Sequence, residues 1–529
     1  MPMSSVVDIR PTIDPMPLSH ALVGVDVISV IDQQGQQASV DSLEEYPGVR
    51  GVTVASDDCD QDWIFVAIPG LTQHGIRFAS TAVDAGATVI LTDEDGARQA
   101  ADLASPVPIV VVAHPRREAA RIAATLANRP ARRLTTMAIT GTNGKTTTSY
   151  LMRAALKTKF ADPALCGTIE TRIGDLRFLS SRTTAEAPVI QRFLALAAER
   201  NLGAAVVESS SHALSFHRID GIVFDVVGFT NLQHDHLDYY GDMDTYFEAK
   251  KQLFTPAHAR RGVVCVDDEW GQRLARESEI PVATVSALTD HQADWQVRDT
   301  HPDQRISRTV FTLIDPDGGR HRVAMPLLGQ VNVQNTAVAI VSAVQLGYEV
   351  NEVITSVENA EQIPGRMQKI NPEATDQPLV IVDYAHTPEA LEWTLRSTRE
   401  LTRGRLIIVF GTDGDRDASK REGLAQVAAQ EADILWVTDE NPRTEDPQEI
   451  RDYLMRGIAN VRPDLHDVTE VKTSRRDATR MAIQAAQAGD TVILTGKGPE
   501  WYQEVMGVKH AYDDAAVAAE VLHYSFTDH

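Results

Sequence analysis

The stretch TGTNGKTTT, Thr140–Thr148, decides how the middle of this sequence folds. The apolar run LTTMAI (134–139) before it is typical of a buried strand, and TTSYLMRAALKTK (147–159) after it is typical of a helix. A glycine-containing turn between a strand and a helix is the context of a phosphate-binding loop. Ile139 stands where the common GxxxxGK[ST] pattern requires its first glycine. The alternative, a glycine-rich turn with a surface lysine, is disfavoured by the flanking strand and helix.

The residue types in this loop suit a nucleotide phosphate. Backbone N–H groups can surround phosphate oxygens, and the positive end of the helix adds to the attraction. Lys145 would neutralise the β- and γ-phosphates, and the hydroxyl of Thr146 can reach Mg²⁺. The sequence therefore predicts an ATP site, whose loop residues are Gly141, Thr142, Asn143, Gly144, Lys145, Thr146 and Thr147.

The chain has 529 residues, which predicts about three domains. Short β-branched runs alternate with helical stretches throughout, as in WIFVAIPG (63–70) and GATVILTD (86–93), so the fold class is α/β. We place a first α/β domain at 1–132, a central P-loop domain at 133–362 and a C-terminal Rossmann-like domain at 363–529. Residues 286–325 are polar, and we expect a meander or an excursion there rather than part of the core.

Composition excludes several classes of function. A net charge of −24 argues against broad binding to nucleic acid or to anionic membranes, which requires basic patches. We find no signal peptide and no apolar run long enough for a membrane span, so we expect a cytoplasmic protein. The three cysteines, Cys59, Cys166 and Cys265, lie far apart, which excludes a recognisable zinc ribbon and favours buried thiols.

Acidic and histidine side chains that could complete a metal site follow two strands of the central block. Glu208 ends the run GAAVVES (203–209), and His234, Asp235, His236 and Asp238 follow the next strand. The alternative is that these side chains are solvated on the surface, but a metal-binding or phosphate-binding role is favoured beside a P-loop. In YFEAKKQLF (246–254) one lysine is predicted to point inward among apolar side chains, and a buried, unpaired ammonium group needs a partner or a modification.

Taken in order, these motifs resemble the Mur ligase family. The resemblance covers about residues 50–505 and includes TGTNGKTTT, ESSSHAL (208–214), GQVNVQN (329–335), IPGRMQ (363–368) and VDYAHTPEAL (382–391). Mur ligases and folylpolyglutamate synthases share the TGTNGKT loop, which explains the absent first glycine. The motifs are most similar to those of the ligases that add the third amino acid to UDP-N-acetylmuramoyl-L-alanyl-D-glutamate. We expect a monomer that binds that compound, a diamino acid and ATP.

The resemblance implies a role for each matching residue. It implies two Mg²⁺ ions held by Thr146, Glu208, His236 and an N-carbamylated Lys250, with Lys145 also catalytic. It implies ATP contacts at Asn332, Asn335, Arg366, Asp383 and His386, beside those of the loop. It implies UDP-muramoyl-peptide contacts at Ser56, His74, Gly75, Thr183, Thr184, Ser210 and Arg218. Two departures occur here: Asp58 stands where the family has Arg, and QHG replaces THG.

The resemblance also implies contacts with the incoming amino acid, at Arg416, Asn441, Arg443, Gly496 and Glu500. The sequence ENPR (440–443) stands where enzymes that add meso-diaminopimelate have DNPR, and the arginine there grips the distal carboxylate. A guanidinium suits a carboxylate, which favours diaminopimelate over L-lysine or L-ornithine. Three residues depart from the usual pattern near this pocket: Glu440 for Asp, Asp413 for Gly and Pro499 for His.

The implied reaction is ATP-dependent amide synthesis through an acyl phosphate. One rival is another ligase on the same scaffold, specific for L-alanine, D-glutamate or D-Ala-D-Ala, or a folylpolyglutamate synthase; ENPRTEDP (440–447) weighs against these. A second is the amidating partner of a glutaminase, whose zinc insert the scattered cysteines do not match. A third is a paralogue that binds UDP-muramoyl peptides without catalysis, which the complete set of catalytic residue types disfavours.

Overall fold

The computed structural model describes residues 4–5, 8–46, 48–70, 73–100, 106–180, 182–303, 308–372 and 376–523. It divides into two compact units. The first contains residues 1–296, 315–319 and 334–357, and the second contains residues 297–314, 320–333 and 358–529. Within the described ranges, no helix combines the length and the apolar character that crossing a membrane requires.

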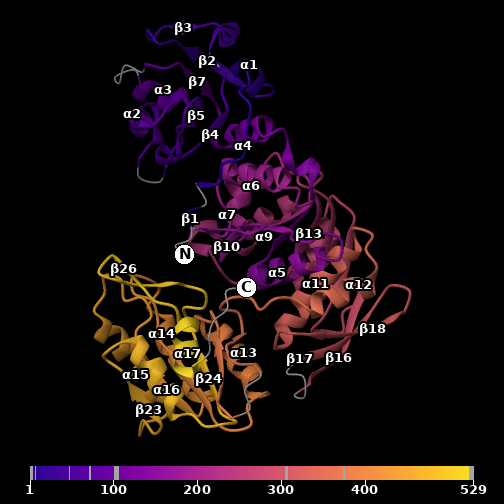
Figure 1. Ribbon diagram of the computed structural model, residues 1–529, viewed down its shortest axis with the longest axis vertical. Coiled ribbons are helices and arrows are strands. Elements are labelled where there is room, and N and C mark those ends of the chain that lie inside the picture. Colours follow the sequence, from indigo (N-terminus) through magenta and orange to yellow (C-terminus); the bar gives the residue numbers. More distant parts are fainter. Residues whose placement is uncertain are drawn as a thin grey trace. The chain divides into compact units, whose positions relative to one another are not determined.

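The first unit begins with a six-stranded sheet in the order β3-β2-β7-β6-β5-β4. Strands β4 to β7 are parallel, whereas β2 is antiparallel to both of its neighbours. The strands are β2 (Val27–Ile31), β3 (Gln37–Ala38), β4 (Gly51–Thr53), β5 (Trp63–Val66), β6 (Ala87–Thr92) and β7 (Ile109–Val112). The helices are α1 (Leu18–Ala21), α2 (Ala79–Asp84), α3 (Glu94–Ala100) and α4 (Pro115–Leu126), with the 3₁₀ turns η2 (Val40–Glu45), η3 (Ser56–Asp58) and η4 (Gly75–Phe78). Figure 1 shows α2, α3 and α4 around this sheet, whose β5 is buried along its whole length, as the apolar run predicts.

The second sheet of this unit has the P-loop strand near its centre. Its order is β1-β11-β10-β9-β12-β8-β13-β14-β15-β16, and the strands from β9 to β16 run parallel. They are β1 (Ser4–Ser5), β8 (Thr135–Thr140), β9 (Ala164–Cys166), β10 (Glu170–Ile173), β11 (Leu176–Leu179), β12 (Ala204–Glu208), β13 (Phe224–Phe229), β14 (Ala259–Cys265), β15 (Val282–Ser286) and β16 (Trp295–Asp303). β12, in the middle of the parallel part, is buried along its whole length, as expected of a strand that is covered on both faces.

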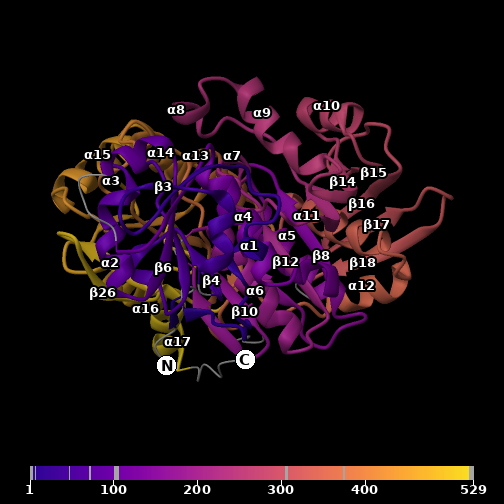
Figure 2. The same cartoon turned by 90° about the horizontal axis from the view of Figure 1, so that it is seen from above.

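Helices and 3₁₀ turns connect the strands of this sheet. They are η5 (Pro130–Arg133), α5 (Lys145–Leu156), α6 (Ala187–Glu199), α7 (Ser211–Ser215), α8 (Leu237–Tyr240), α9 (Met243–Lys251), η6 (Gln252–Phe254), α10 (Glu269–Glu277), α11 (Gln330–Val344) and α12 (Val350–Glu358). Asp242 begins α9 by accepting a hydrogen bond from the backbone N–H of Thr245 at 2.7 Å. Figure 2 shows α9 near α10, and a salt bridge of 3.1 Å between Lys251 and Glu277 joins the two helices.

The N-terminal residues, to which the sequence assigns no structure, contact the central sheet first. Ser4 and Ser5 form β1 alongside β11, and Ile9 is fully buried in the central hydrophobic core. Thr12 then donates two hydrogen bonds of 2.9 Å to the carboxylate of Glu199 at the end of α6. The chain enters the first domain only after this contact, so these residues tie the two sheets of the first unit together.

The segment 286–325 forms strands. It contains β16, then β17 (Arg308–Ile314) and β18 (Arg320–Met325), which pair as an antiparallel hairpin. Phe311, Leu313 and Met325 are at most 1% exposed. The hairpin confirms the expectation of a meander, whereas the expectation that the segment lies outside the core is wrong, because these apolar side chains are buried.

The second unit contains a sheet in the order β19-β20-β24-β21-β22-β23, parallel apart from β19. Its strands are β19 (Gln368–Lys369), β20 (Leu379–Val382), β21 (Leu406–Phe410), β22 (Ile434–Val437), β23 (Val468–Glu470) and β24 (Thr491–Leu494), followed by the hairpin β25 (Tyr502–Val505) and β26 (Val508–Ala511). Its helices are α13 (Pro388–Arg399), α14 (Lys420–Glu431), α15 (Pro447–Val461), α16 (Arg475–Ala485) and α17 (Asp514–Leu522). The four strands predicted for this part of the chain are β20, β21, β22 and β24. The α/β class is confirmed.

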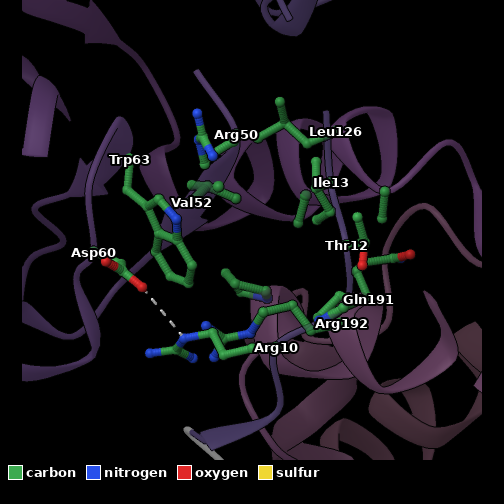
Figure 3. Close-up of a pocket in the computed structure, with 15 residues that line it drawn as sticks. Arg10, Thr12, Ile13, Arg50, Val52, Asp60, Trp63, Leu126, Gln191 and Arg192 are labelled. Atoms are coloured by element: carbon green, nitrogen blue, oxygen red, sulfur yellow. Dashed lines mark ion pairs between the residues drawn. The ribbon is translucent and has the colours of Figure 1, made fainter. Parts of the chain in front are cut away.

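A buried ion pair connects the first domain to the central one within the first unit. The carboxylate of Asp58, which is 2% exposed, accepts hydrogen bonds of 3.1 and 2.8 Å from the guanidinium of Arg192 on α6. Arg10 lies 3.0 Å from the same carboxylate. The guanidinium groups of Arg10 and Arg192 lie 4.8 and 5.0 Å from the ring centroid of Trp63, beside a cavity of about 270 Å³ (Figure 3).

Removing Asp58 tests this connection. We expect Asp58→Ala to lower the free energy of unfolding by about 3–5 kcal/mol, because it leaves the buried Arg192 charge unpaired. The control is Asp60→Ala, since Asp60 is exposed and its ion pair with Arg10 is 3.8 Å long; it should cost at most about 1 kcal/mol. Chemical denaturation measures both, and equal costs for the two variants would contradict a joining role for Asp58.

Candidate active site

The predicted phosphate loop joins the end of β8 to the start of α5. Gly141 and Gly144 have φ values of +148° and +86°, in the region that favours glycine. A Cβ atom at Gly144 would also overlap the side chain of Asn335, so this position requires glycine on both grounds. Asn231 supports the loop by accepting a hydrogen bond of 3.0 Å from the backbone N–H of Asn143. The sequence reading of a strand, a glycine turn and a helix is confirmed.

Two lysine side chains converge on this loop. Lys145 donates hydrogen bonds to the carbonyl oxygens of Gly141 at 3.0 Å and Thr142 at 2.8 Å. Lys250, on α9, donates to the same Gly141 oxygen at 2.9 Å and is 1% exposed, whereas Lys251 is accessible. Burial, and then the charge of Lys145, lowers the pKa of the Lys250 amine well below its ordinary value. The inward lysine predicted from the sequence is therefore Lys250, and its neutral amine is favoured.

The carboxylate of Glu208 lies at the end of β12, fully buried beside α5. It accepts hydrogen bonds from the hydroxyl groups of Thr146 at 3.1 Å and Ser149 at 3.2 Å. Thr168 donates to it from its hydroxyl group at 2.8 Å and its backbone at 3.1 Å. This array of carboxylate and hydroxyl oxygens next to the phosphate loop has the hard donor chemistry that Mg²⁺ prefers.

The four central-domain residues predicted to contact a muramoyl peptide lie together beside Glu208. The hydroxyl of Thr184 donates to the Glu208 carbonyl oxygen at 2.7 Å and accepts from the backbone N–H of Ser210 at 3.0 Å. Arg218 donates to the carbonyl oxygen of Thr184 at 3.1 Å. The hydroxyl oxygens of Thr183 and Thr168 lie 3.2 Å apart, and the Thr168 hydroxyl donates to the Glu208 carboxylate at 2.8 Å.

His236, another predicted metal ligand, lies in a cluster of rings. Its ring centroid is 4.9 Å from that of His212 and 6.1 Å from that of Tyr246, and the Lys250 amine is 4.6 Å from the Tyr246 ring. In the described ranges, no group of three or more His, Cys, Asp and Glu side chains is arranged to hold a metal. Glu208 and His236 therefore do not by themselves form a closed metal site.

The first domain presents the other predicted substrate residues. Ser56 begins η3, and the buried His74 caps η4 by accepting a hydrogen bond of 3.1 Å from the backbone N–H of Ile76. The other ring nitrogen of His74 is 3.1 Å from Asp93. Both ring nitrogens are thus engaged within the protein, as is the backbone N–H of Gly75, which donates to the carbonyl oxygen of Ile68 at 2.9 Å.

The predicted ATP contacts beyond the loop lie on α11 and in the second unit. Asn335 lies against Gly144 in the first unit, while Asn332 donates to the carbonyl oxygen of Leu328 at 2.7 Å in the second. At the end of β20, Asp383 accepts hydrogen bonds from the backbone N–H groups of Met367 at 2.8 Å and Ala385 at 2.9 Å.

The side chains of Arg366 and His386 flank one tyrosine near Asp383. The Arg366 guanidinium lies 4.4 Å from the ring centroid of Tyr384, and the His386 ring lies 4.6 Å from it. A buried Nη1 atom of Arg366 has no hydrogen-bond partner. Burial lowers the pKa of His386. These residues therefore gather at one end of the sheet, as the sequence predicts.

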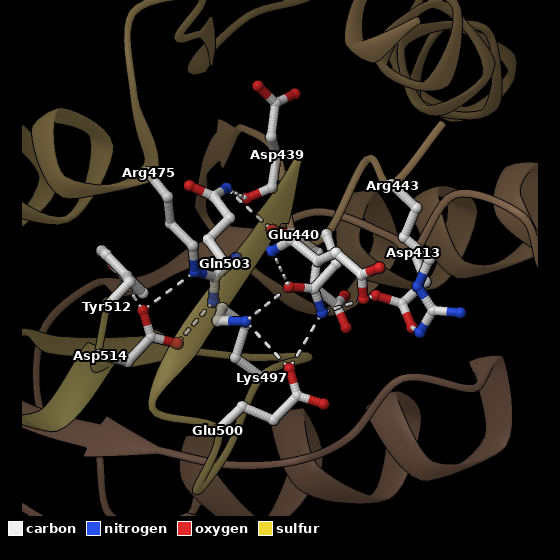
Figure 4. A network of polar contacts seen from close by, with 12 residues as sticks. Asp413, Asp439, Glu440, Arg443, Arg475, Lys497, Glu500, Gln503, Tyr512 and Asp514 are labelled. Carbon is white, nitrogen blue, oxygen red and sulfur yellow. Dashed lines mark hydrogen bonds and ion pairs between the residues drawn. The ribbon is translucent and has the colours of Figure 1, made fainter. Parts of the chain in front are cut away.

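Three of the residues predicted to bind the incoming amino acid, Asn441, Arg443 and Glu500, belong to a network of polar contacts in the second unit (Figure 4). Arg443 pairs with Asp413 at 2.8 Å, and the Asn441 amide donates to Asp413 and to Glu500, each at 2.9 Å. Lys497 donates to Asn441 at 3.0 Å and to Glu500 at 2.9 Å. In the network as described, none of these contacts involves Arg416, whose side chain is exposed.

Glu440 lies under this network, 4% exposed and against Gly496. Its Oε2 atom is buried without a hydrogen-bond partner. Burial, and then the charge of Asp413, raises the pKa of the Glu440 carboxyl group to about 8. Glu440 is therefore mainly protonated at neutral pH, and a second ionised carboxylate next to Asp413 is avoided.

Sequence reasoning missed two residues of the site. Lys497 is completely buried and holds both Asn441 and Glu500, and its signal was its place within GKGPE (496–500). Thr168 contacts Glu208 from the loop between β9 and β10, and no pattern in the sequence marks it. Its role depends on a contact between residues 40 positions apart.

Comparison with known proteins identifies the class. Residues 139–343 match the model of the Mur ligase middle domain, and residues 365–498 match that of the Mur ligase, glutamate ligase domain. The chain belongs to the Mur ligase family of ATP-dependent ligases, and the resemblance found in the sequence is confirmed.

Individual relatives narrow the comparison. The chain is 41% identical over 518 residues to a UDP-N-acetylmuramyl-tripeptide synthetase of Leifsonia xyli subsp. xyli, covering 96% of each chain. It is 40% identical over 492 residues to a UDP-N-acetylmuramoyl-L-alanyl-D-glutamate–2,6-diaminopimelate ligase of Streptomyces coelicolor, covering 93% of this chain and 95% of that one. A solved structure of a ligase with the same name matches with a TM-score of 0.64 at 30% identity, over 90% of this chain and 96% of that one.

The raised pKa of Glu440 predicts a pH-dependent stability. Between its ordinary pKa of 4.5 and about 8, the folded protein keeps a proton that the unfolded chain releases, so this group lowers stability as pH rises through that window. We expect Glu440→Gln to remove this contribution, so that the variant gains thermal stability relative to the unmodified protein between pH 5 and pH 9. Melting temperatures across that range measure it, with the exposed Glu449→Gln as control. A difference that stays constant with pH would contradict the assignment.

Proposed function

We propose that this protein joins a diamino acid to UDP-N-acetylmuramoyl-L-alanyl-D-glutamate at the expense of ATP, a step of peptidoglycan precursor synthesis. The observation that carries the proposal is the arrangement around Glu208. One side of it contacts Thr146 of the phosphate loop, and the other contacts the Thr184, Ser210 and Arg218 cluster. A nucleotide phosphate and a peptide carboxylate can therefore meet there. The names of the relatives, which include 2,6-diaminopimelate ligases, support the same step.

The reaction that fits this arrangement has two stages. The free γ-carboxylate of the D-glutamyl residue attacks the γ-phosphorus of ATP, forming an acyl phosphate and releasing ADP. The neutral amine of the incoming amino acid then attacks the acyl carbon, an amide bond forms, and inorganic phosphate leaves. The first stage is mainly a matter of charge and alignment, and Lys145 supplies the positive charge next to the loop amides.

The proposal also includes a site for two Mg²⁺ ions. Thr146, Glu208, His236 and Lys250 would hold two Mg²⁺ ions, which neutralise phosphate charge in reactions of this kind. A neutral Lys250 amine can add to CO₂, giving a carbamate and a proton, and thereby present oxygen atoms in place of a buried amine. The lowered pKa of Lys250 and its position at the loop support this modification.

The remaining contacts are assigned by the same proposal. Gly141, Thr142, Asn143, Gly144, Lys145, Thr146, Thr147, Asn332, Asn335, Arg366, Asp383 and His386 bind ATP, and Ser56, His74, Gly75, Thr183, Thr184, Ser210 and Arg218 bind the UDP-muramoyl peptide. Arg416, Asn441, Arg443, Gly496 and Glu500 bind the amino acid. The domain boundaries at 132/133 and 362/363, a monomeric state and a cytoplasmic location belong to the proposal as well.

Substitution of Lys250 tests the carbamate. We expect Lys250→Ala to lower the rate by about 10- to 100-fold or more, since a metal ligand is lost. Millimolar acetate or propionate should restore part of the activity, because either supplies a carboxylate in the space that the side chain leaves. Lys251→Ala, with a partly exposed amine, is the matched control and should keep its activity. An inactive, folded Lys250→Ala protein that no small carboxylic acid restores would count against carbamylation.

Phosphate release tests the function itself. The protein is supplied with ATP, Mg²⁺ and UDP-N-acetylmuramoyl-L-alanyl-D-glutamate, and meso-diaminopimelate, L-lysine and L-ornithine are offered in parallel. We expect release that depends on both the peptide and an amino acid. Omission of the peptide is the control for ATP hydrolysis. The same assay with UDP-N-acetylmuramic acid and L-alanine tests a different ligase of the family, and release only in that reaction would overturn the proposed step.

A further inference from the structure

At one end of the network, the carboxylate of Asp413 contacts Arg443 and Asn441, two residues that are expected to bind the amino acid. Asp413 lies just after β21, and one of its oxygens is 2.8 Å from Nη2 of Arg443. Its other oxygen accepts a hydrogen bond of 2.9 Å from the amide of Asn441. The side chains of Arg443 and Asp413 are 20% and 21% exposed, so both can be reached by a small molecule.

Arg443 is held in this position by its backbone. It has a φ value of +53°, which is uncommon for a side chain with a Cβ atom. Its N–H donates to the carbonyl oxygen of Glu504 at 3.0 Å, and its own carbonyl oxygen accepts from Met506 at 2.6 Å. Both partners belong to the hairpin β25–β26 and its turn. These contacts fix the backbone of Arg443, and the ion pair with Asp413 holds its guanidinium.

The charges in the network balance without a ligand. Lys497 is committed to Glu500 and Asn441, and Arg443 is committed to Asp413. Glu440, the third carboxyl group, is buried beneath them and protonated at neutral pH. Arg443 and Lys497 are therefore matched by Asp413 and Glu500. A ligand carboxylate that entered beside Arg443 would have to displace Asp413 or lie next to a like charge, whereas an ammonium group would meet the exposed part of Asp413.

We propose that Asp413 is a specificity-determining residue: it weakens the binding of a distal carboxylate by Arg443 and lets the pocket accept a diamino acid that ends in an ammonium group alone, such as L-lysine or L-ornithine. This inference rests on the proposed function and names the amino acid that the same site takes. The opposite role, in which Asp413 only orients Arg443 for a distal carboxylate, makes the opposite prediction for its removal.

The test compares Asp413→Gly and Asp413→Asn with the unmodified protein. The kcat/KM values for L-lysine, L-ornithine and meso-diaminopimelate are measured by phosphate release with saturating ATP and UDP-N-acetylmuramoyl-L-alanyl-D-glutamate. We expect the unmodified protein to use L-lysine or L-ornithine at least as well as diaminopimelate. Asp413→Gly should lower kcat/KM for that amino acid by about 10- to 100-fold and leave the value for diaminopimelate unchanged or higher. Asp413→Asn should shift the ratio in the same direction, because it removes the charge and keeps the size.

Two features make the result decisive. The contact of Arg421 with residue 413 uses the backbone carbonyl oxygen, at 3.2 Å, so it survives both substitutions. Asp417→Asn, a change of an exposed carboxylate on the same loop, is the matched control and should leave the ratio unaltered. A preference of the unmodified protein for diaminopimelate over both other amino acids by more than about 100-fold would overturn the proposal, as would a loss of diaminopimelate use in Asp413→Gly. Phosphate release with none of the three amino acids would instead overturn the proposed function.

Discussion

The carbonyl oxygen of Gly141 accepts hydrogen bonds from two lysine side chains, and the active site depends on that convergence. Lys145 comes from the helix that the loop begins, and Lys250 comes from α9, more than a hundred residues later. Two ammonium groups at one buried oxygen repel each other, so burial and charge together favour a neutral Lys250. The neutral amine and the positive charge of Lys145 beside the loop are the two observations on which the proposed carbamate and the proposed phosphate contacts rest.

Glu208 organises the other side of the same loop. Its buried carboxylate is surrounded by hydroxyl donors from α5 and from the loop after β9, and its backbone oxygen accepts from Thr184. A single residue at the end of a central strand thus borders both the phosphate loop and the cluster assigned to the peptide. This follows from the parallel sheet, because all of its strands have their carboxyl ends at the same edge.

In the second unit, the charged side chains of the network around Asp413 are balanced by one another within the protein. Arg443 and Lys497 are paired with Asp413 and Glu500, and Glu440 stays protonated because burial makes a further charge costly. A substrate that binds in such a pocket replaces one member of an existing ion pair, so a single added carboxylate can change which amino acid is bound. The buried pair of Arg475 and Asp514 near this network follows the same pattern, with both side chains fully enclosed.

The sequence by itself determined the local elements and the family. The loop, the α/β class and the four strands of the second unit follow from short-range patterns of apolar residues, glycine and proline, and the motifs identified most of the residues that gather at the phosphate loop and, separately, in the network of the second unit. It misjudged only the burial of residues 286–325, because polar side chains lie among the apolar ones that the hairpin buries, and it missed Thr168, Lys497 and the role of residues 4–12. Only the tertiary structure decided that Asp413 pairs with Arg443, that Asp58 pairs with Arg192 and that Lys250 reaches Gly141. Each of these contacts joins residues 30 to 134 positions apart, and the energy of a charge depends on which neighbours the fold brings within a few ångströms of it.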